Sequence, residues 1–428
     1  MIGSSALWPG RGPGRLHTTF RHPRYHCSHG LEGRFSPKFR DAMDNIFFRM
    51  GRVYRVLRRT HHVSVVPWLI AAAFCCMRVC VWCAMALDNV FFPSLKRTRA
   101  NRPIVLVGNP RTGTTFLQRF LSDEGFGSGM ELFLMLYPSL LLQKILRPLL
   151  PLLEKMSPAK FHSTDAHQTS LSSVETDDVG VLFRYLDGLF LYGFFLSFED
   201  EDLVRFMDPR VRDTSKRDFA WLEALWRRSL VLHKTDRNIA KLFSVSIRLP
   251  RFLAQFPEAQ ILYMARDPLS VIPSSMSLVA GVLDRAFGFW SLPENVRKRW
   301  LDRMYKAWIM LFQRFHEDWT SGVIDKRRVY IVRYDRMMAD FENVMLEICD
   351  FLGHAMTPKL QASVRARGEK QRKYESAHKY NLAKFGLSEA NIRRDCAFYY
   401  GTFLPPMGQG QLDQPSWPDH SPVGQSTV

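Results

Sequence analysis

One stretch of the sequence, residues 103–115, constrains the fold more than any other. The run PIVLVG at 103–108 carries no charge, which is typical of a strand buried on both faces in a parallel sheet. It leads into NPRTGTTFLQRFL, a glycine-containing turn that opens an amphipathic helix. Two further apolar strands are expected within 259–268 and 329–335, with helical patterns at 219–231 and 296–318. Strands that alternate with helices predict an α/β fold, in which helices cover both faces of a parallel central sheet.

The turn after the first expected strand has the spacing of a phosphate-binding loop. Gly108 and Gly113 are separated as in G-x-x-x-x-G-x-T, but Thr114 stands where a Walker lysine would be. Backbone N–H groups in such a loop, at the N-terminus of a helix, surround phosphate oxygens. Arg111 supplies a cation in place of the lysine, and the alternative is a βα turn without a ligand. The loop therefore predicts a P-loop-like three-layer sandwich that binds a phosphate-like group.

Two motifs resemble the sulfotransferases that use 3′-phosphoadenosine 5′-phosphosulfate (PAPS). The loop residues that carry the resemblance are Pro110, Arg111, Thr112, Gly113, Thr114 and Thr115. Further along, ILYMARDPLSVIPSS places Arg266 after a strand and Ser274 eight residues later, as in the second motif of that family. The resemblance implies that the loop binds the 5′-phosphosulfate, and that Arg266 and Ser274 bind the 3′-phosphate. Ligands of open α/β sheets bind at the carboxyl ends of strands, where both motifs are expected.

The resemblance extends over residues 100–400 and implies further site residues. LHKTDRN at 232–238 is similar to a lysine-containing segment of the tyrosylprotein sulfotransferases and their bacterial relatives, which implies that Lys234 contacts the sulfonyl group and the bridging oxygen. Arg365, Arg367 and Gly368 lie in VRARGEKQRK. This segment is expected either to form a flexible basic loop that closes over the nucleotide or to be a solvated run of charge.

The general base has several candidates. Glu131 lies 20 residues after Arg111, about where the relatives place an acidic base, and it stands in the apolar run GMELFLM. His167 ranks second and Glu175 third, and His162 is a further rival. An ordinary half-exposed helical glutamate and surface histidines are the alternatives. Asp177 and Asp178 are interpreted as a solvated helix start.

Sulfuryl transfer moves a charged group in line between two oxygens, for which phosphoryl transfer is the nearest template. Arg111 and Lys234 would neutralise the charge that develops on the leaving phosphate, and no metal is expected to take part. The resemblance implies an acceptor hydroxyl or amine, and a lipid, a carbohydrate and a small alcohol are the acceptors considered. The apolar runs at 132–153 and 189–195 favour either a hydrophobic acceptor pocket or ordinary core helices.

The N-terminal quarter differs from the rest in charge and hydropathy. Residues 1–60 carry +9 of the net charge of +18. We expect residues 1–40 to be a disordered or targeting arm, 41–99 a basic and apolar helical region, 100–403 the sulfotransferase domain, and 404–428 a disordered tail. Residues 63–87 are apolar apart from Arg78, and four cysteines crowd this stretch.

The apolar stretch at 63–87 predicts one of three structures: a helix lying on a membrane, a membrane span or a buried core helix. Residues 49–90 are thus a possible membrane-binding region. Basic residues on both sides of the stretch leave its orientation undefined. The domain would lie in a lumen if 63–87 spans a Golgi membrane, and in an organelle if 1–40 is a transit peptide.

Two other functions compete with a sulfotransferase at this point. A P-loop kinase or NTPase is disfavoured because the Walker lysine is missing. A basic protein that binds nucleic acid or membrane, with an inactive nucleotide pocket, fits the net charge. The presence of Arg111, Lys234, Arg266 and Ser274 favours a working nucleotide site, and no nucleic acid is expected as partner.

Overall fold

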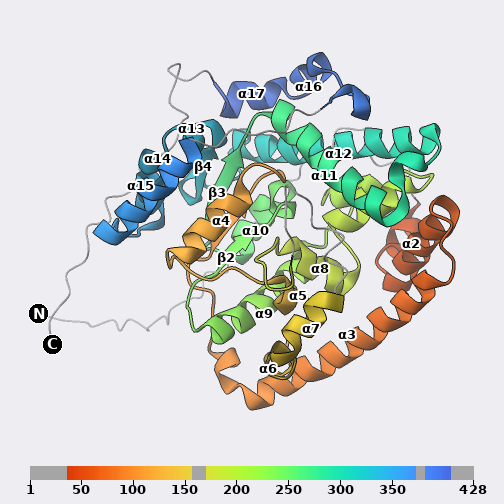
Figure 1. Cartoon of the computed structure of the whole chain (residues 1–428), viewed down its shortest axis with the longest axis horizontal. Helices are drawn as coiled ribbons and strands as arrows, with labels where there is room; N and C mark the ends of the chain where they lie inside the picture. The colour runs from red at the N-terminus through yellow and green to blue at the C-terminus, as the bar shows by residue number, and fades with distance from the viewer. Residues whose placement is uncertain (1–35, 157–169, 373–380, 406–428) are drawn as a thin grey trace, which may run out of the picture.

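The computed structural model describes residues 36–156, 170–372 and 381–405, and a parallel sheet lies at its centre (Figure 1). Its strands are β1 (Ile104–Val107), β2 (Ile239–Lys241), β3 (Gln260–Ala265) and β4 (Val329–Arg333). They are ordered β2-β1-β3-β4, and every neighbouring pair is parallel. The predicted parallel sheet is confirmed, and β2 is a strand that the sequence analysis did not foresee.

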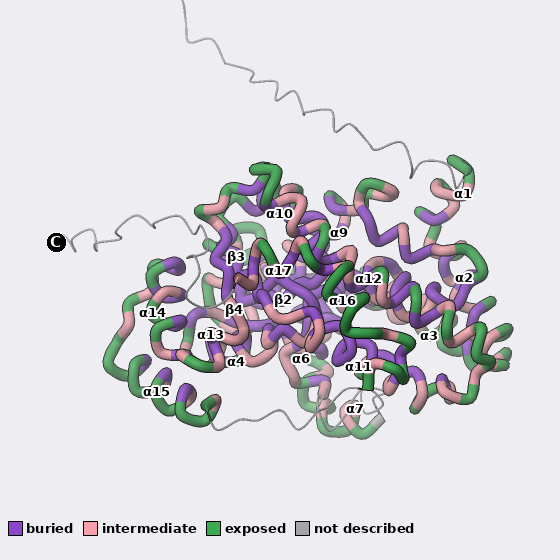
Figure 2. Tube along the Cα trace, turned by 90° about the horizontal axis from the view of Figure 1, so that it is seen from above, coloured by how far each residue is buried: buried purple, intermediate pink, exposed green. Residues whose placement is uncertain are grey.

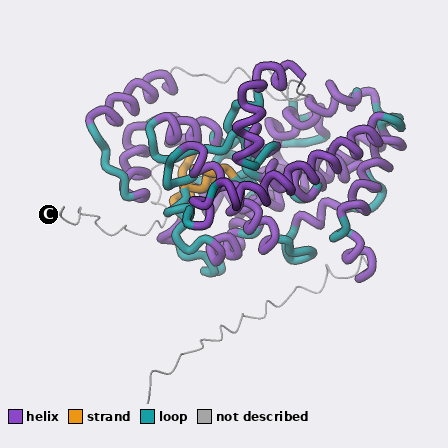
Figure 3. The backbone as a smooth tube through the Cα atoms, turned by 90° about the horizontal axis from the view of Figure 1, so that it is seen from below, coloured by secondary structure: helices purple, strands orange, loops and turns teal. Residues whose placement is uncertain are grey.

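Consecutive residues of β1 and of β3 are all buried. Because successive side chains of a strand point to opposite faces, both faces of the sheet are covered. Val105 and Tyr263 belong to one hydrophobic core, whereas Leu106 and Leu262 belong to a second core on the other face. The first core receives buried side chains from α8 (Asp178–Tyr185), α9 (Ser215–His233), α10 (Leu249–Gln255), α11 (Pro268–Phe287), α12 (Glu294–Thr320), α16 (Glu389–Asp395) and α17 (Ala397–Phe403). The second receives them from α4 (Thr114–Asp123), α13 (Tyr334–Ala339), α14 (Phe341–Leu352) and α15 (Pro358–Arg372). Figure 3 shows the strands enclosed by helices, as expected for a three-layer sandwich.

Short helices follow α4 in the chain and lead to α8 of the first core. They are α5 (Leu132–Leu136), α6 (Leu140–Leu146), the 3₁₀ turn η2 (Arg147–Leu149) and α7 (Leu150–Met156). Residues 132–136 are mostly buried, whereas Ile145, Leu149 and Leu152 are exposed. The apolar run at 132–153 is therefore part core and part surface.

The N-terminal extension is helical, as predicted, and its second helix packs on the main core. It comprises α1 (Pro37–Ala42), α2 (Ile46–Thr60) and α3 (Val66–Phe91). The buried guanidinium of Arg49 donates hydrogen bonds of 2.8 Å to the backbone oxygens of Tyr185 and Leu186. Met43 and Val56 belong to the same core as β1. The division of the chain near residue 100 stays a prediction, and most of the expected arm and tail lies outside the described residues.

Helix α3 contrasts with the other long helices. It is long and apolar enough to cross a membrane by length and composition, and only 11% of its most apolar window is buried. Figure 2 colours the chain by burial, with buried residues in purple and exposed residues in green. Most of the apolar surface of α3 is thus left open by the rest of the fold.

Candidate functional site

The sheet has a topological switch point between β1 and β3. From β1 the chain continues to β2 on one side, and later enters β3 on the other side of β1. The connections that follow β1 and β3 consequently leave the same edge in different directions, which opens a crevice between them. The loop 108–113 and residues 266–267 lie at this crevice.

The loop after β1 has an unusual backbone. Arg111 is a non-glycine residue with a left-handed φ of 69°, and Gly113 has a φ of 92°. A Cβ on Gly113 would lie 3.0 Å from the Tyr334 ring, so this position requires glycine for space as well as for conformation. The Thr112 hydroxyl donates to the Asn109 backbone oxygen at 2.8 Å and closes the turn. Backbone strain of this kind is characteristic of ligand-binding loops.

The two motifs that were predicted to bind anions contact each other directly. Arg111 Nε donates a hydrogen bond to Ser274 Oγ at 3.0 Å, although the residues are 163 positions apart. Arg266 donates to the backbone oxygen of Arg111 at 2.7 Å. The Arg266 guanidinium also stacks 3.9 Å from the centre of the Tyr334 ring. Every predicted residue of the loop, together with Arg266 and Ser274, thus lies at this one crevice.

A cation that the sequence analysis missed lies beside the loop. Lys241 is the last residue of β2 and is only 2% exposed, and its Nζ lies 3.1 Å from Thr115 Oγ1. Burial lowers the pKa of Lys241, while the carboxylates of Glu175 and Asp177 raise it. The segment NIAK is too short for its sequence pattern to predict a strand. The sequence analysis therefore did not place Lys241 at the carboxyl end of the sheet.

Lys234, the lysine that the resemblance implied, lies elsewhere. It is an exposed residue with a left-handed φ of 54° at the end of α9, before β2 begins. The neighbouring Asp236 accepts a hydrogen bond from Asn101, which precedes β1. Lys234 therefore lies toward the amino ends of the strands, away from the loop that follows β1.

Two of the candidate bases lie on adjacent backbone segments. The Glu131 carboxylate pairs with Arg147 at 2.7 Å. His233 lies near the Glu131 carboxylate. Burial lowers the pKa of His233, and the Glu131 charge opposes this only in part. The Glu175 backbone N–H donates to the Met130 oxygen at 3.3 Å, and its buried side chain is within electrostatic range of Lys241. His162 and His167 lie outside the described residues.

Asp177 and Asp178 were expected to be a solvated helix start, and this expectation is wrong. Both are buried against β2 and the turn that follows it. Asp177 accepts a hydrogen bond from Trp226 at 2.8 Å, and Asp178 accepts one from the backbone of Phe243 at 2.7 Å. Burial raises the pKa of Asp177 to about 7, which the Trp226 hydrogen bond partly opposes. The two carboxylates fasten the end of β2 and so support Lys241.

The basic segment that begins at 364 is not a flexible loop over its described part. Residues 364–372 belong to helix α15. Arg367 stacks 5.9 Å from the rings of Phe116 and Phe120 on α4, and Arg365 pairs with Glu342 at 3.5 Å. Gly368 is buried against α14. The helix lies against α4, but its contacts are with that helix and α14, and a role toward the nucleotide stays a prediction.

No group of three or more histidine, cysteine, aspartate or glutamate side chains in the described part of the chain is arranged to hold a metal ion.

The family comparison agrees with this geometry. The family model described as "Sulfotransferase family" matches residues 103–358, which is more than half of the chain and includes both predicted motifs. The chain belongs to the sulfotransferase family. The resemblance drawn from the two motifs is thereby confirmed at the level of the family.

Relatives of this sulfotransferase-family chain have been found in mycobacteria. It is 24% identical over 262 residues to the omega-hydroxy-beta-dihydromenaquinone-9 sulfotransferases Stf3 of Mycobacterium bovis and Mycobacterium tuberculosis. The matched region is 59% of this chain and 63% of each relative, so the chain spans less than two thirds of their length.

Solved structures of two mycobacterial sulfotransferases have the same fold. STF1 of Mycobacterium tuberculosis matches with a TM-score of 0.62 and 17% identity, over 84% of this chain and 92% of that one. STF9 of Mycobacterium avium matches with a TM-score of 0.57 and 18% identity, over 75% and 81%. At these identities the likeness concerns the fold alone. The family match begins at residue 103, so α1, α2 and α3 precede it.

Proposed function

We propose that this chain transfers a sulfuryl group from PAPS to a hydroxyl or amine of an acceptor. The observation that carries the proposal is the contact between the loop after β1 and the residues after β3, where Arg111 and Ser274 are 3.0 Å apart. A nucleotide with two separate anionic groups needs two such sites in one crevice. Membership of the sulfotransferase family favours sulfuryl transfer over the phosphoryl transfer of a kinase or NTPase.

The two ends of the donor are assigned to the two motifs. Backbone N–H groups of residues 110–115 and the Arg111 guanidinium would bind the 5′-phosphosulfate at the start of α4. Arg266 and Ser274 would bind the 3′-phosphate. The Tyr334 ring holds Arg266 in place, because a guanidinium stacked on an aromatic ring loses few of its hydrogen-bond donors.

Lys241 takes the role that the resemblance first implied for Lys234. As the acceptor oxygen bonds to sulfur, the bond from sulfur to the bridging oxygen breaks, and negative charge develops on the departing phosphate. A buried ammonium beside Thr115 stabilises that charge far more than an exposed one, because little water screens it. This chemistry needs no metal ion.

Glu131 is the proposed general base, and Glu175 is the alternative. Glu131 is held in position by the Arg147 guanidinium, 2.7 Å away. Glu175 is deeper and closer to Lys241. A base must come within hydrogen-bond reach of the acceptor proton, and only the acceptor complex will place one of the two there.

A lipid alcohol is the favoured acceptor, ahead of a carbohydrate or a small alcohol. Directly after Glu131, Leu132 and Phe133 pack with Leu171 in an apolar cluster of their own, separate from the two main cores. The mycobacterial relatives are named for an omega-hydroxylated dihydromenaquinone. An apolar chain beside the base would bring a terminal hydroxyl to the site.

The test is transfer of labelled sulfate from PAPS to a panel of lipid alcohols, carbohydrates and small alcohols, by the full-length chain in EDTA. Labelled product from at least one acceptor is expected. Glu131→Gln should reduce turnover by about 10²–10⁴-fold and remove the acidic limb of the pH profile of kcat, whereas Glu175→Gln should keep that limb. Transfer of phosphate from ATP, with no use of PAPS, would contradict the proposal.

A further inference from the structure

Apart from Asn89, the exposed residues of α3 are apolar or cysteine along the whole helix. Trp68 and Leu69 near its start, Val79 and Trp82 in its middle, and Val90 and Phe91 at its end are each 61–72% exposed. An apolar surface of this extent is rare on a monomeric soluble protein and marks an interaction site. At 1.5 Å per residue, the 26 residues of the helix extend about 39 Å.

A narrow stripe on the opposite side of α3 is fixed to the domain. Val81, Ala84 and Asp88 are buried and follow one another at intervals of three and four residues, which puts them on one face. Asp88 is fully buried and accepts hydrogen bonds from Ser139 Oγ at 2.8 Å and from Arg228 Nε at 2.8 Å. The helix is consequently held along its side, with its other faces open.

Helix α6 packs beside α3 (Figure 1). Ile145 on α6, Leu149 on η2 and Leu152 on α7 add further exposed apolar side chains, each 48–57% exposed. The exposed apolar side chains of α3, α6, η2 and α7 are called the apolar docking face below.

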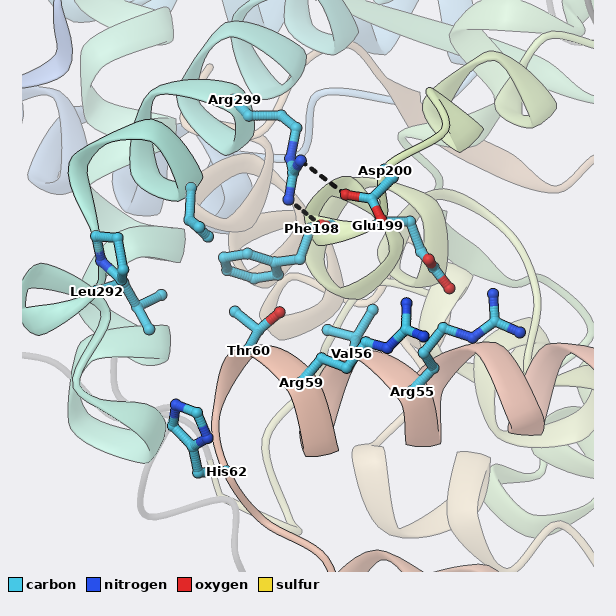
Figure 4. Close-up of a pocket in the computed structure, with 12 residues that line it drawn as sticks. Arg55, Val56, Arg59, Thr60, His62, Phe198, Glu199, Asp200, Leu292 and Arg299 are labelled. Atoms are coloured by element: carbon cyan, nitrogen blue, oxygen red, sulfur yellow. Dashed lines mark hydrogen bonds and ion pairs between the residues drawn. The ribbon is translucent and has the colours of Figure 1, made fainter.

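Basic side chains stand at both ends of α3. Arg55, Arg58 and Arg59 precede it and are exposed, and Lys96, Arg97 and Arg99 follow it and are exposed. Arg55 and Arg59 line a pocket of about 340 Å³ between the end of α2 and the start of α12 (Figure 4). The pocket also contains Glu199 and Asp200, but these carboxylates pair with Arg52 and Arg299.

We propose that the apolar docking face lies in the plane of an anionic phospholipid bilayer, with α3 parallel to the surface. Positive charge at both ends of the helix fits phosphate head groups at both ends, whereas a span would carry one end across the hydrocarbon. A span would also pull Asp88 and its buried partners into lipid, at a high cost in free energy. Arg55 and Arg59 are both exposed, and neither forms an ion pair within 4.0 Å in the described part of the chain, although the carboxylates of Glu199 and Glu201 attract Arg55. This inference does not rest on the proposed function.

Vesicle flotation of the full-length chain tests the docking. Binding to phosphatidylcholine vesicles should increase when phosphatidylglycerol is included. The double variant Trp68→Glu, Trp82→Glu should lower binding at least about tenfold, because two indole rings leave the lipid. Leu346→Glu, an equivalent change at the exposed leucine of α14, should leave binding unchanged. No binding by the wild type, or equal binding by the double variant, would overturn the proposal.

Charge reversal tests the basic ends separately. Arg55→Glu with Arg59→Glu should lower binding to anionic vesicles by roughly fivefold or more for each charge and leave binding to neutral vesicles unchanged. Lys359→Glu with Lys370→Glu, on exposed positions of α15, is the matched control. Equal losses in both pairs would attribute the effect to net charge and contradict a docking role for α2.

Fluorophores at the two ends of α3 distinguish lying from spanning. Val66→Cys and Val90→Cys are labelled one at a time with NBD in the folded protein, in a chain whose cysteines at 27, 75, 76, 80 and 83 are replaced by alanine and whose Cys349 and Cys396 are buried, and the protein is added to preformed vesicles. Dithionite added outside should reduce both labels. Protection of one label would show a span. A vesicle-free dimer in which both labels are buried would show that a second copy covers the face, and either result would overturn the proposal.

Discussion

The crevice at the carboxyl ends of the strands and the surface of α3 differ in which side chains they bury and which they expose. At the crevice, charged groups are buried: Lys241 is 2% exposed and lies against Thr115, and Arg111 and Arg266 are held by partners inside the fold. On α3, large apolar groups are exposed, and the buried positions are few. Burying charge and exposing apolar surface both cost free energy in water, and the two proposals assign a ligand to each region: a polyanion to the crevice and a lipid surface to α3.

The largest effect on stability is expected where α3 meets the domain. Asp88→Ala leaves Arg228 buried without its carboxylate and removes the acceptor for the start of α6, so unfolding should become easier by about 3–5 kcal/mol. Asp200→Ala breaks an exposed pair with Arg299 and should cost less than about 1 kcal/mol. Urea denaturation of both variants provides the comparison. Equal losses would mean that α3 is not fixed through Asp88.

Lys241, which the structure places beside Thr115, and Lys234, which the resemblance implied, are two candidates for the same role, and substitutions distinguish them. Lys241→Met should lower kcat/KM for PAPS by about 10²–10³-fold, because it removes a buried charge beside the site of the leaving phosphate. Lys234→Met, at an exposed position, should change it by less than about threefold. The reverse order would restore Lys234 to the site and remove Lys241 from it.

Two valines on α3 test whether the exposed face contributes to folding. Val81 is 5% exposed, and Val81→Ala should destabilise the fold by about 1–3 kcal/mol through lost burial and a small cavity. Val79 is 61% exposed, and Val79→Ala should leave stability within about 0.5 kcal/mol in the absence of lipid. A large loss for Val79→Ala in lipid-free buffer would show that the face is covered in solution.

Gly113 in the loop after β1 and Gly125 in the turn after α4 distinguish crowding from backbone strain. Gly125→Ala introduces a side chain at a φ of 81° with open space around it, which should cost about 1–2 kcal/mol from strain alone. Gly113→Ala adds a contact 3.0 Å from the Tyr334 ring, so its loss should be larger. Calorimetry with 3′-phosphoadenosine 5′-phosphate should then show weaker binding for Gly113→Ala only. Weakening by both variants would contradict a specific role for the loop.

The support beneath Lys241 is expected to depend on pH. The pKa of Asp177 is raised to about 7 by burial, so its stabilising, protonated form is present at low pH and is lost as the pH rises toward 7. Asp177→Asn should remove this loss, and its stability relative to wild type should rise by up to about 1.4 kcal/mol per pH unit between pH 4 and 7. Denaturation at several pH values measures the slope. A constant difference would show that Asp177 is ionised throughout.

The sequence predicted those parts of the fold and site that depend on neighbours in the chain. The strand at 104–107, its loop and α4 were recognisable because hydrophobic pattern, glycine spacing and helix start coincide within twenty residues. Arg266 and Ser274 were recognisable through the resemblance to the second sulfotransferase motif, because they follow a strand at its spacing. Both motifs were expected at the carboxyl ends of strands, but the direct contact between Arg111 and Ser274 was not predicted.

What the sequence did not predict depends on packing between distant segments. Strand β2 is three residues long, and only its pairing with β1 gives Lys241 its place. Asp177 and Asp178 were expected to be solvated because charge predicts exposure, yet Trp226 and the backbone after β2 bury them. Arg49 likewise belongs to a basic stretch, but it is buried and donates hydrogen bonds to the backbone oxygens of Tyr185 and Leu186, which are 136 and 137 residues away in the chain. The surroundings of α3 could not be predicted from the sequence either, because a membrane span, a helix on a membrane surface and a core helix can have the same hydropathy pattern.

The most direct test of the central claim is calorimetric titration of the full-length chain with 3′-phosphoadenosine 5′-phosphate. We expect the wild type to bind, Arg266→Ala and Lys241→Met each to weaken binding by at least about tenfold, and Lys234→Met to bind like the wild type. Absence of binding by the folded wild-type chain would contradict the claim that the crevice between β1 and β3 is a working nucleotide site.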